Sequence, residues 1–130
     1  MANPNIVAVT SIKGESIGEA LTTTLDTAVM TVASDKLVKI NFISVANDHA
    51  STAIDVTVSI TKAGFTSDGI GSGEDNAALI FLASTVRCPA DDVLVVIDKP
   101  VYLMEGDTLD AGASAATADI FVSYEVIDDA

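Results

Sequence analysis

The 130-residue chain has one cysteine, no tryptophan and only six lysine and arginine residues. A single cysteine, Cys88, cannot form an internal disulfide, which excludes a disulfide framework. The scarcity of basic side chains argues against partners such as nucleic acid or anionic membranes, whose phosphates must be neutralised. The longest apolar runs, 77–83 and 93–97, are far shorter than the ~20 residues of a membrane-spanning helix. We therefore expect no nucleic-acid partner and no membrane partner.

The chain is instead rich in apolar residues and in acids. Hydrophobic residues make up 49% of it, and 19 aspartates and glutamates give a net charge of -13. A chain this apolar can bury enough surface to offset its conformational entropy, which excludes disorder. The start, Met1–Asn5, has no basic segment followed by an apolar one, as a secretory signal would. We expect one soluble domain over residues 1–130, synthesised inside the cell.

Alternation of apolar and polar residues dominates the chain, and the helical period is nearly absent. Residues 54–61 carry an apolar side chain at every second position, which is typical of a half-buried antiparallel strand. Residues 36–45 alternate as far as Phe42, after which Ile43 and Val45 break the pattern. That break predicts either a register change or a strand buried on both faces.

About eight short strands are expected, at intervals near 8–12 residues. They fall at 6–12, twice within 22–32, and at 36–45, 54–61, 78–86, 93–97, 101–104 and 120–126. The polar segment Asn47–Ser51 has the length of a hairpin turn, and the Ala-rich residues 111–118 are expected to form a loop or a tight crossover. The sequence predicts an all-β fold: a single antiparallel β-sandwich, jelly-roll-like or Ig-like, with residues 1–12 as an N-terminal arm or edge strand.

One segment resembles a catalytic motif. Gly14–Gly18 matches the Gly-x-Ser-x-Gly nucleophile elbow, which needs a strand-to-helix turn and a histidine that follows the serine and an acid in the chain. No helix pattern follows, and the single histidine is His49. A glycine-flanked turn between the first two strands is the better interpretation. The acidic pairs Asp91–Asp92 and Asp128–Asp129 are expected to be solvated, so we predict no catalytic residues and no enzyme.

Metal and cofactor sites are equally hard to build from this chain. His49 and Cys88 are too few ligands for a zinc or other transition-metal site, and we interpret Cys88 as a partly buried structural thiol. The acidic, glycine-rich segment Asp68–Asn76 lacks the order of a dinucleotide fingerprint, a phosphate-binding loop or an EF-hand. It is interpreted as an acidic surface loop, with calcium binding through its oxygens left open as an alternative. We predict no cofactor and no metal.

The second half of the chain carries a recognisable order of motifs, in Ser84–Leu94, Ile97–Leu109 and Ile120–Glu125. It resembles small β-sandwich virion proteins of tailed bacteriophages, of the capsid decoration (cement) type. In such chains a strand ends in a Pro-containing turn. A Lys-Pro-hydrophobic-x-Leu-x-x-Gly-Asp-x-Leu segment then precedes an Ala-rich stretch and a Val-Ser-Tyr-Glu closing strand. The resemblance covers roughly residues 20–127, including a hairpin expected over Ile40–Ile60.

The resemblance implies a structural role without catalytic residues. A decoration protein binds the outer surface of an assembled capsid, so the implied partners are the major capsid protein and further copies of this chain, as a homotrimer. The implied location is the outside of the virion, after synthesis in the host cytoplasm. Asn3–Val9 is then expected to pair with a neighbour's sheet edge. A tail, neck or fibre-associated role, or a loop-based module binding carbohydrate or calcium, remains the alternative.

Overall fold

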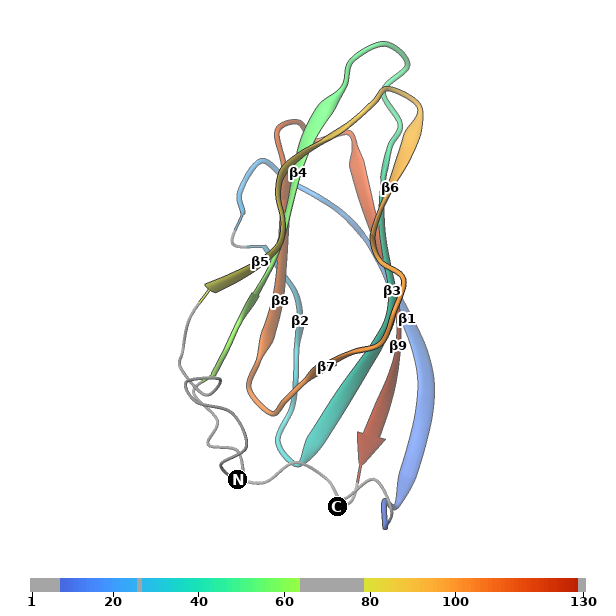
Figure 1. Ribbon diagram of the computed structural model, residues 1–130, viewed down its shortest axis with the longest axis vertical. Helices are drawn as coiled ribbons and strands as arrows, with labels where there is room; N and C mark the ends of the chain where they lie inside the picture. The colour runs from blue at the N-terminus through green and yellow to red at the C-terminus, as the bar shows by residue number, and fades with distance from the viewer. Residues whose placement is uncertain (1–7, 26, 64–78, 129–130) are drawn as a thin grey trace.

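The computed structural model describes residues 8–25, 27–63 and 79–128. This part of the chain is all-β, with two antiparallel sheets packed against each other as a β-sandwich (Figure 1). The predicted fold class is confirmed. The strands are β1 (Ser11–Ala20), β2 (Thr27–Thr31), β3 (Lys36–Asn47), β4 (Ile54–Thr61), β5 (Leu79–Cys88), β6 (Asp92–Ile97), β7 (Val101–Leu103), β8 (Thr108–Ala113) and β9 (Ala118–Asp128).

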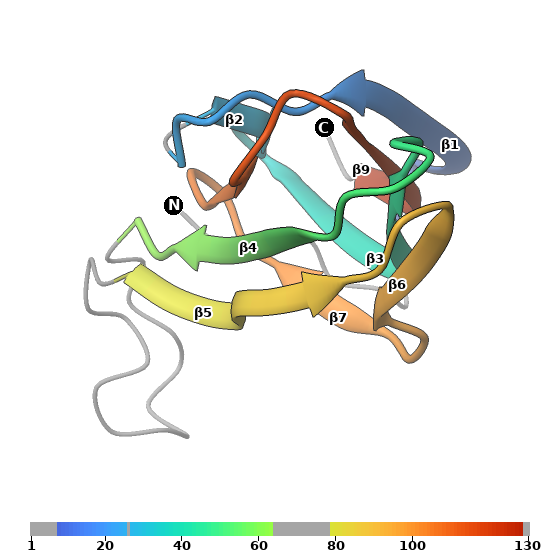
Figure 2. The same ribbon diagram turned by 90° about the horizontal axis from the view of Figure 1, so that it is seen from above.

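Most consecutive strands lie in different sheets, although β4 and β5 share one sheet and β6 and β7 share the other. Sheet A has the order β1-β9-β3-β6, with β7 also paired to β3, and sheet B has the order β2-β8-β4-β5. In the view of Figure 2, β1 and β2 lie on one side of the sandwich, and β5 and β7 lie on the opposite side. The expected hairpin over Ile40–Ile60 is therefore wrong, because β3 belongs to sheet A and β4 to sheet B.

A buried amide explains why the segment after β3 crosses between the sheets. The Asn47 side chain donates from Nδ2 to the carbonyl oxygens of Thr52 (2.9 Å) and Pro89 (3.2 Å). Its Oδ1 accepts from the backbone N–H of His49 and from the Thr117 hydroxyl, both at 3.1 Å. Such a fully bonded buried amide holds three connections together at one corner of the sandwich. The polar turn was visible in the sequence, but its partners were not.

Strand β3 contains a register change, which is one of the two possibilities that its sequence left open. Its pairing with β9 shifts between Ile40 and Phe42. Before the shift the even-numbered Ile40 is buried, and after it Ile43 and Val45 are buried. A β-bulge accounts for this, because one extra residue in a strand exchanges its two faces. Phe42 is thereby directed to the outer face of sheet A, opposite Ser123 of β9.

Two sequence-based interpretations are corrected by the strands. Gly14–Gly18 is not a turn but the middle of β1, which pairs with β9 along its whole length. The Ala-rich stretch is not a loop throughout, because residues 111–113 complete β8 between β2 and β4. Small side chains are required there: a Cβ on Gly112 would lie 2.9 Å from the Cα of Leu25. Packing against this neighbour overrides the weak strand preference of alanine and glycine.

The expected early strands are also shifted along the chain. Residues 22–24 are not in a strand, and β2 begins at Thr27. The first strand was expected over 6–12, but β1 begins at Ser11. Residues 1–7 lie outside the described part, so most of the predicted N-terminal arm is not described.

The core lies between the two sheets. Strand β4 contributes its even-numbered residues from Ile54 to Ile60, and β9 contributes those from Ala118 to Tyr124. Both sets follow the period of two expected for strands with one buried face. The alternation read from the sequence therefore identified the inward side chains of the central strands.

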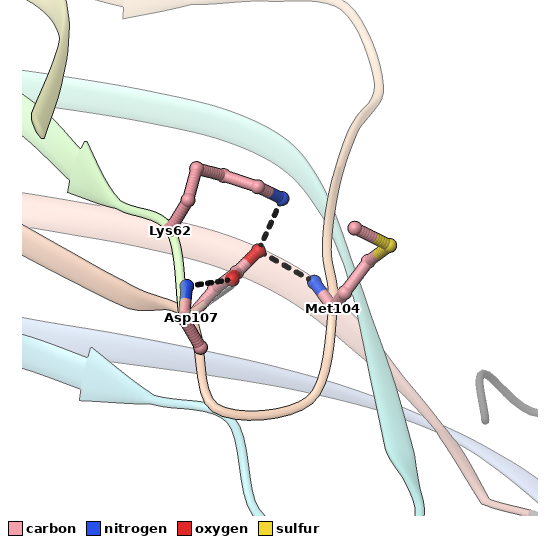
Figure 3. A network of polar contacts seen from close by, with 4 residues as sticks. Lys62, Met104 and Asp107 are labelled. Atoms are coloured by element: carbon pink, nitrogen blue, oxygen red, sulfur yellow. Dashed lines mark hydrogen bonds and ion pairs between the residues drawn. The ribbon is translucent and has the colours of Figure 1, made fainter. Parts of the chain in front are cut away.

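A buried carboxylate links the turn between β7 and β8 to the end of β4 (Figure 3). The Asp107 side chain is fully buried. Its Oδ2 accepts from the Lys62 ammonium (2.7 Å) and the Met104 N–H (3.0 Å), and its Oδ1 accepts from the Ala63 N–H (3.0 Å). Gly106, at φ 84°, makes the turn possible because a left-handed conformation strains any side chain. Charge-assisted bonds of this kind are the strongest polar contacts in a protein.

Removing the Asp107 carboxylate should destabilise the whole sandwich. Asp107→Ala leaves the Lys62 ammonium and two backbone N–H groups without their acceptor, and we expect a loss of about 3 kcal/mol in the free energy of unfolding. Urea denaturation followed by circular dichroism measures it. As the control, Asp98→Asn changes an exposed carboxylate and should stay within about 0.5 kcal/mol of wild type. Equal stabilities of the two variants would contradict the role of Asp107.

Candidate functional site

Exposed apolar side chains are gathered on two surfaces of the described part. Isolated exposed apolar residues are ordinary, whereas clusters of them mark contact surfaces. Five of the exposed large side chains belong to sheet A: Ile12, Val93, Val95, Tyr102 and Phe121. The other four belong to β5: Leu79, Ile80, Phe81 and Val86.

The first surface is the outer face of sheet A, which we define by strand register. It consists of Gly14, Ser16, Gly18 and Ala20 of β1; Asp119, Phe121, Ser123 and Glu125 of β9; Lys39, Phe42, Ser44 and Ala46 of β3; Val93 and Val95 of β6; and Tyr102 of β7. Residues paired across neighbouring strands point to the same face of a sheet. Seven of these fifteen residues are glycine, alanine or serine, and they lie mainly on β1 and at the end of β3.

Phe121 projects from the middle of this face. It pairs with Gly18 on one side and Ser44 on the other, and 45% of its surface is exposed. A shallow depression lies on either side of it. The first is lined by the small residues Gly18, Ala20, Ser44 and Ala46 and by the acids Glu19 and Asp119. The second is lined by Gly14, Ser16, Asn41 and Ser123 and by the acids Glu15 and Glu125. Phe121 lines both, so a single aromatic knob stands between two hollows.

The outer face of sheet A is nearly neutral. Of its three charged residues, Lys39 and Glu125 form an ion pair, with 3.6 Å between Nζ and Oε2. Glu125 also accepts a hydrogen bond from the amide of Asn41 at 3.2 Å. Only Asp119 remains as an exposed acid on this face in the part of the chain that the structure describes. A face with about one net negative charge contrasts with the -13 of the chain.

The second surface is the edge strand β5. Among the described strands it pairs with β4 alone, so its other edge carries backbone groups with no strand partner. The apolar residues Leu79, Ile80 and Phe81 are each about half exposed. No residue from 79 to 86 is charged. Natural edge strands are usually blunted by charges or proline, and β5 carries neither over this length.

Strand β5 is irregular at two places. Its register with β4 shifts between Val56 and Val58 and again between Val58 and Ser59. Thr85 lies in the first bulge at φ 48°, and its N–H donates to the Thr57 hydroxyl at 3.0 Å. Residues 79–81, which pair regularly with β4, are therefore the apolar part of β5 best suited to a partner.

The sequence-predicted candidates for chemistry are not brought together. Ser16 of the Gly-x-Ser-x-Gly match lies in an extended strand, which lacks the sharp turn of a nucleophile elbow. His49 uses Nδ1 to accept from the N–H groups of Ser51 (3.1 Å) and Thr52 (3.0 Å), so its imidazole supports its own turn. The described residues contain no group of three His, Cys, Asp or Glu side chains able to hold a metal ion.

Asp91 lies in an exposed turn at φ 53°, and Asp92 accepts from the N–H of Val93 at 2.7 Å. Asp128 forms an ion pair with Lys36. Asp129 and the segment Asp68–Asn76 lie outside the described residues, so calcium binding by that segment stays a prediction.

The Cys88 thiol is enclosed at the end of β5. It is completely buried, with Sγ 3.5 Å from the Asp92 carbonyl and 3.9 Å from the Val45 carbonyl. Burial raises the pKa of Cys88 above its usual value, as does the nearby Asp92 carboxylate. The thiol is therefore a structural core group, as the sequence suggested, although more deeply buried than expected.

Comparison with known proteins adds no identity. No protein-family model matches the chain, and no curated protein matches it. Within the described ranges, no helix is long and apolar enough to cross a membrane. The function therefore has to be inferred from the chain's own surfaces and motifs.

The two apolar surfaces were the functional features that the sequence did not reveal. The pattern of residues 78–86 predicted a strand, but nothing in it distinguishes an edge strand from a central one. Phe121 did leave a signal. It occupies the outward position between the buried Ile120 and Val122, where β9 otherwise carries polar residues.

The glycines of β1 should be replaceable in a way that the glycine of β8 is not. No atom lies within 4 Å of a Cβ added to Gly14, whereas a Cβ on Gly112 would meet Leu25 and Thr24 at 2.9 and 3.0 Å. We expect Gly14→Ala to stabilise the fold by about 0.5 kcal/mol and Gly112→Ala to destabilise it. Thermal unfolding midpoints measure both. A destabilised Gly14→Ala variant would show that β1 needs its glycine within the monomer.

The buried thiol should be chemically silent in the folded protein. Iodoacetamide at pH 8 is expected to modify Cys88 slowly in native buffer and rapidly in urea, because the thiolate is both inaccessible and scarce. Since the folded pKa is raised, its contribution to stability is complete at neutral pH. That contribution is lost as the pH rises through the ordinary thiol pKa, where the unfolded chain ionises first. Fast native labelling would contradict this placement.

Proposed function

We propose that this chain is a structural virion protein that binds the outer surface of an assembled phage capsid and stabilises the shell. The observation that carries the proposal is the uncharged apolar edge of β5 on an otherwise acidic sandwich. An exposed edge of this kind is suited to a protein partner rather than to a small molecule. The described residues contain no group of three His, Cys, Asp or Glu side chains that could hold a metal ion, which is compatible with a structural role.

The motif on which the resemblance to decoration proteins rests performs an architectural task in this fold. Its leucines, Leu103 and Leu109, are buried in the core. Its Gly-Asp pair, Gly106 and Asp107, forms the turn between β7 and β8 and binds Lys62. The motif thus describes a scaffold, and the role rests on the surface that the scaffold displays.

Binding through β5 can combine two contributions. A strand of the partner can add to the free edge through backbone hydrogen bonds, and the half-exposed side chains of Leu79, Ile80 and Phe81 can be buried at the same time. The absence of charge in 79–86 means that no ion has to be desolvated. The remaining acidic surface keeps the outward side soluble and makes decorated particles repel one another.

Stabilisation of the shell then follows from mass action. A ligand that binds the assembled state alone stabilises it by RT ln(1 + [L]/Kd) per site, which is about 2.7 kcal/mol when the free concentration is 100 times Kd. Many sites on one shell multiply this effect. No covalent step and no conformational change in the protein is required.

Co-sedimentation with purified shells tests the proposal. We expect the wild-type chain to sediment with shells of the phage that encodes it, at a copy number close to that of the major capsid protein. Phe81→Lys places a charge on the β5 edge and should weaken binding at least about tenfold. Ser51→Lys adds the same charge at an exposed turn and should bind like wild type.

Each failure has a distinct meaning. No sedimentation of the wild type would overturn capsid binding. A copy number far below that of the capsid protein would favour the tail, neck or fibre-associated role. Full binding by Phe81→Lys would exclude β5 as the contact surface.

A further inference from the structure

We infer that the outer face of sheet A is a self-association surface, on which two copies of this chain pack face to face about a twofold axis. In this arrangement the Phe121 side chain of each copy occupies the small-residue hollow beside Phe121 of the other. The surface is separate from β5, and the inference does not rest on capsid binding.

Shape is the first argument. The knob and its hollow lie side by side on one face, since Phe121 lines the depression that Gly18, Ala20, Ser44 and Ala46 form together with Glu19 and Asp119. An interface between identical copies about a twofold axis requires that one patch carry both a projecting group and the recess for it. This face meets that requirement, whereas a projection without a recess would fit a different partner.

The glycines supply a second argument. Gly18 lies inside β1, where glycine weakens a strand. Nothing in the monomer needs it, because no atom lies within 4 Å of where its Cβ would be. A side chain there would instead fill the hollow next to Phe121. Glycine within a strand often marks a place where another chain approaches closely.

Charge permits a second copy on this face. Two molecules that each carry -13 repel each other, and the repulsion is weaker where local charge is balanced. On the outer face of sheet A, Lys39 and Glu125 compensate each other. Asp119 remains, and Glu19 also lines the hollow. Half-exposed Val93 and Val95 extend the apolar area toward β6, so aromatic, aliphatic and small residues form a continuous contact surface.

The size of the face indicates a weak dimer. Stable interfaces typically involve 20–30 residues on each side, and smaller ones belong to transient complexes. The residues of this face fall below that range, so we expect a dissociation constant on the order of micromolar. A twofold pair also differs from the trimer that the resemblance implies, and the mass in solution separates the two.

Analytical ultracentrifugation of the full chain, without shells, tests the inference. A concentration series from micromolar to millimolar should show a reversible monomer–dimer equilibrium. Phe121→Ser removes the knob and Gly18→Leu fills the hollow, and each should raise the dissociation constant at least about tenfold. Phe81→Lys, on β5, is the control and should dimerise like wild type. Higher salt should strengthen the dimer, because it screens the repulsion between acidic copies.

The outcomes that overturn the inference are equally definite. A monomer across the series, a trimer, or a dimer that both outer-face variants leave unchanged would each refute it. Phe121 and Gly18 are exposed, so both variants should fold, and their unfolding midpoints verify this. Because no shell is present, failure here leaves capsid binding untouched, and failure of capsid binding leaves this result untouched.

Discussion

One buried carboxylate constrains how the two sheets are joined. Asp107 binds the end of β4 through Lys62 and Ala63 and closes the turn that brings the chain from β7 in sheet A to β8 in sheet B. The Asp107 carbonyl also accepts from Val32, just after β2. Because the Asp107 side chain is fully buried, these bonds fix the relative position of three strand ends. At the opposite corner the amide of Asn47 does the same for the connections after β3 and β5.

With the connections fixed in this way, the strands that lack a neighbour are determined. Sheet B ends at β5, and sheet A presents β1, β9, β3 and β6 as one broad outer face. The two exposed apolar surfaces are therefore different in kind, since one is a strand edge and the other a sheet face. A strand edge offers backbone hydrogen bonds, and a face offers shape. A protein of this form can bind one partner through each surface at the same time.

Sequence patterns predicted what depends on nearest neighbours in the chain. The period of two in residues 54–61 and 120–126 identified inward side chains, and the break at Ile43 identified the register change. Pairing between strands could not be predicted in the same way. The predicted hairpin over Ile40–Ile60 was wrong because a short polar segment can connect two strands of one sheet or cross between two sheets. Here the Asn47 side chain holds the crossing through its hydrogen bonds to Thr52, Pro89 and Thr117. The predicted turn at Gly14–Gly18 was wrong because an edge strand tolerates glycine, and two glycines close together in a sequence are typical of a turn.

The bulge in β3 gives this protein an uneven tolerance to changes in length. Before the bulge the even-numbered residues of β3 face the core, and after it the odd-numbered residues do. Loss of a single residue at Ser44 would turn Val45 outward and bring Ala46 into the interior. Loss of Asn41 would instead remove the bulge and leave Ile43 and Val45 facing the core, because Ile40 and Phe42 already pair with the neighbouring residues Tyr124 and Ser123 of β9. An insertion in the exposed turn at residues 50–51 would leave every strand face as it is. Length variation among descendants of this chain should therefore accumulate in its connections and, within its central strand, be confined to the bulge.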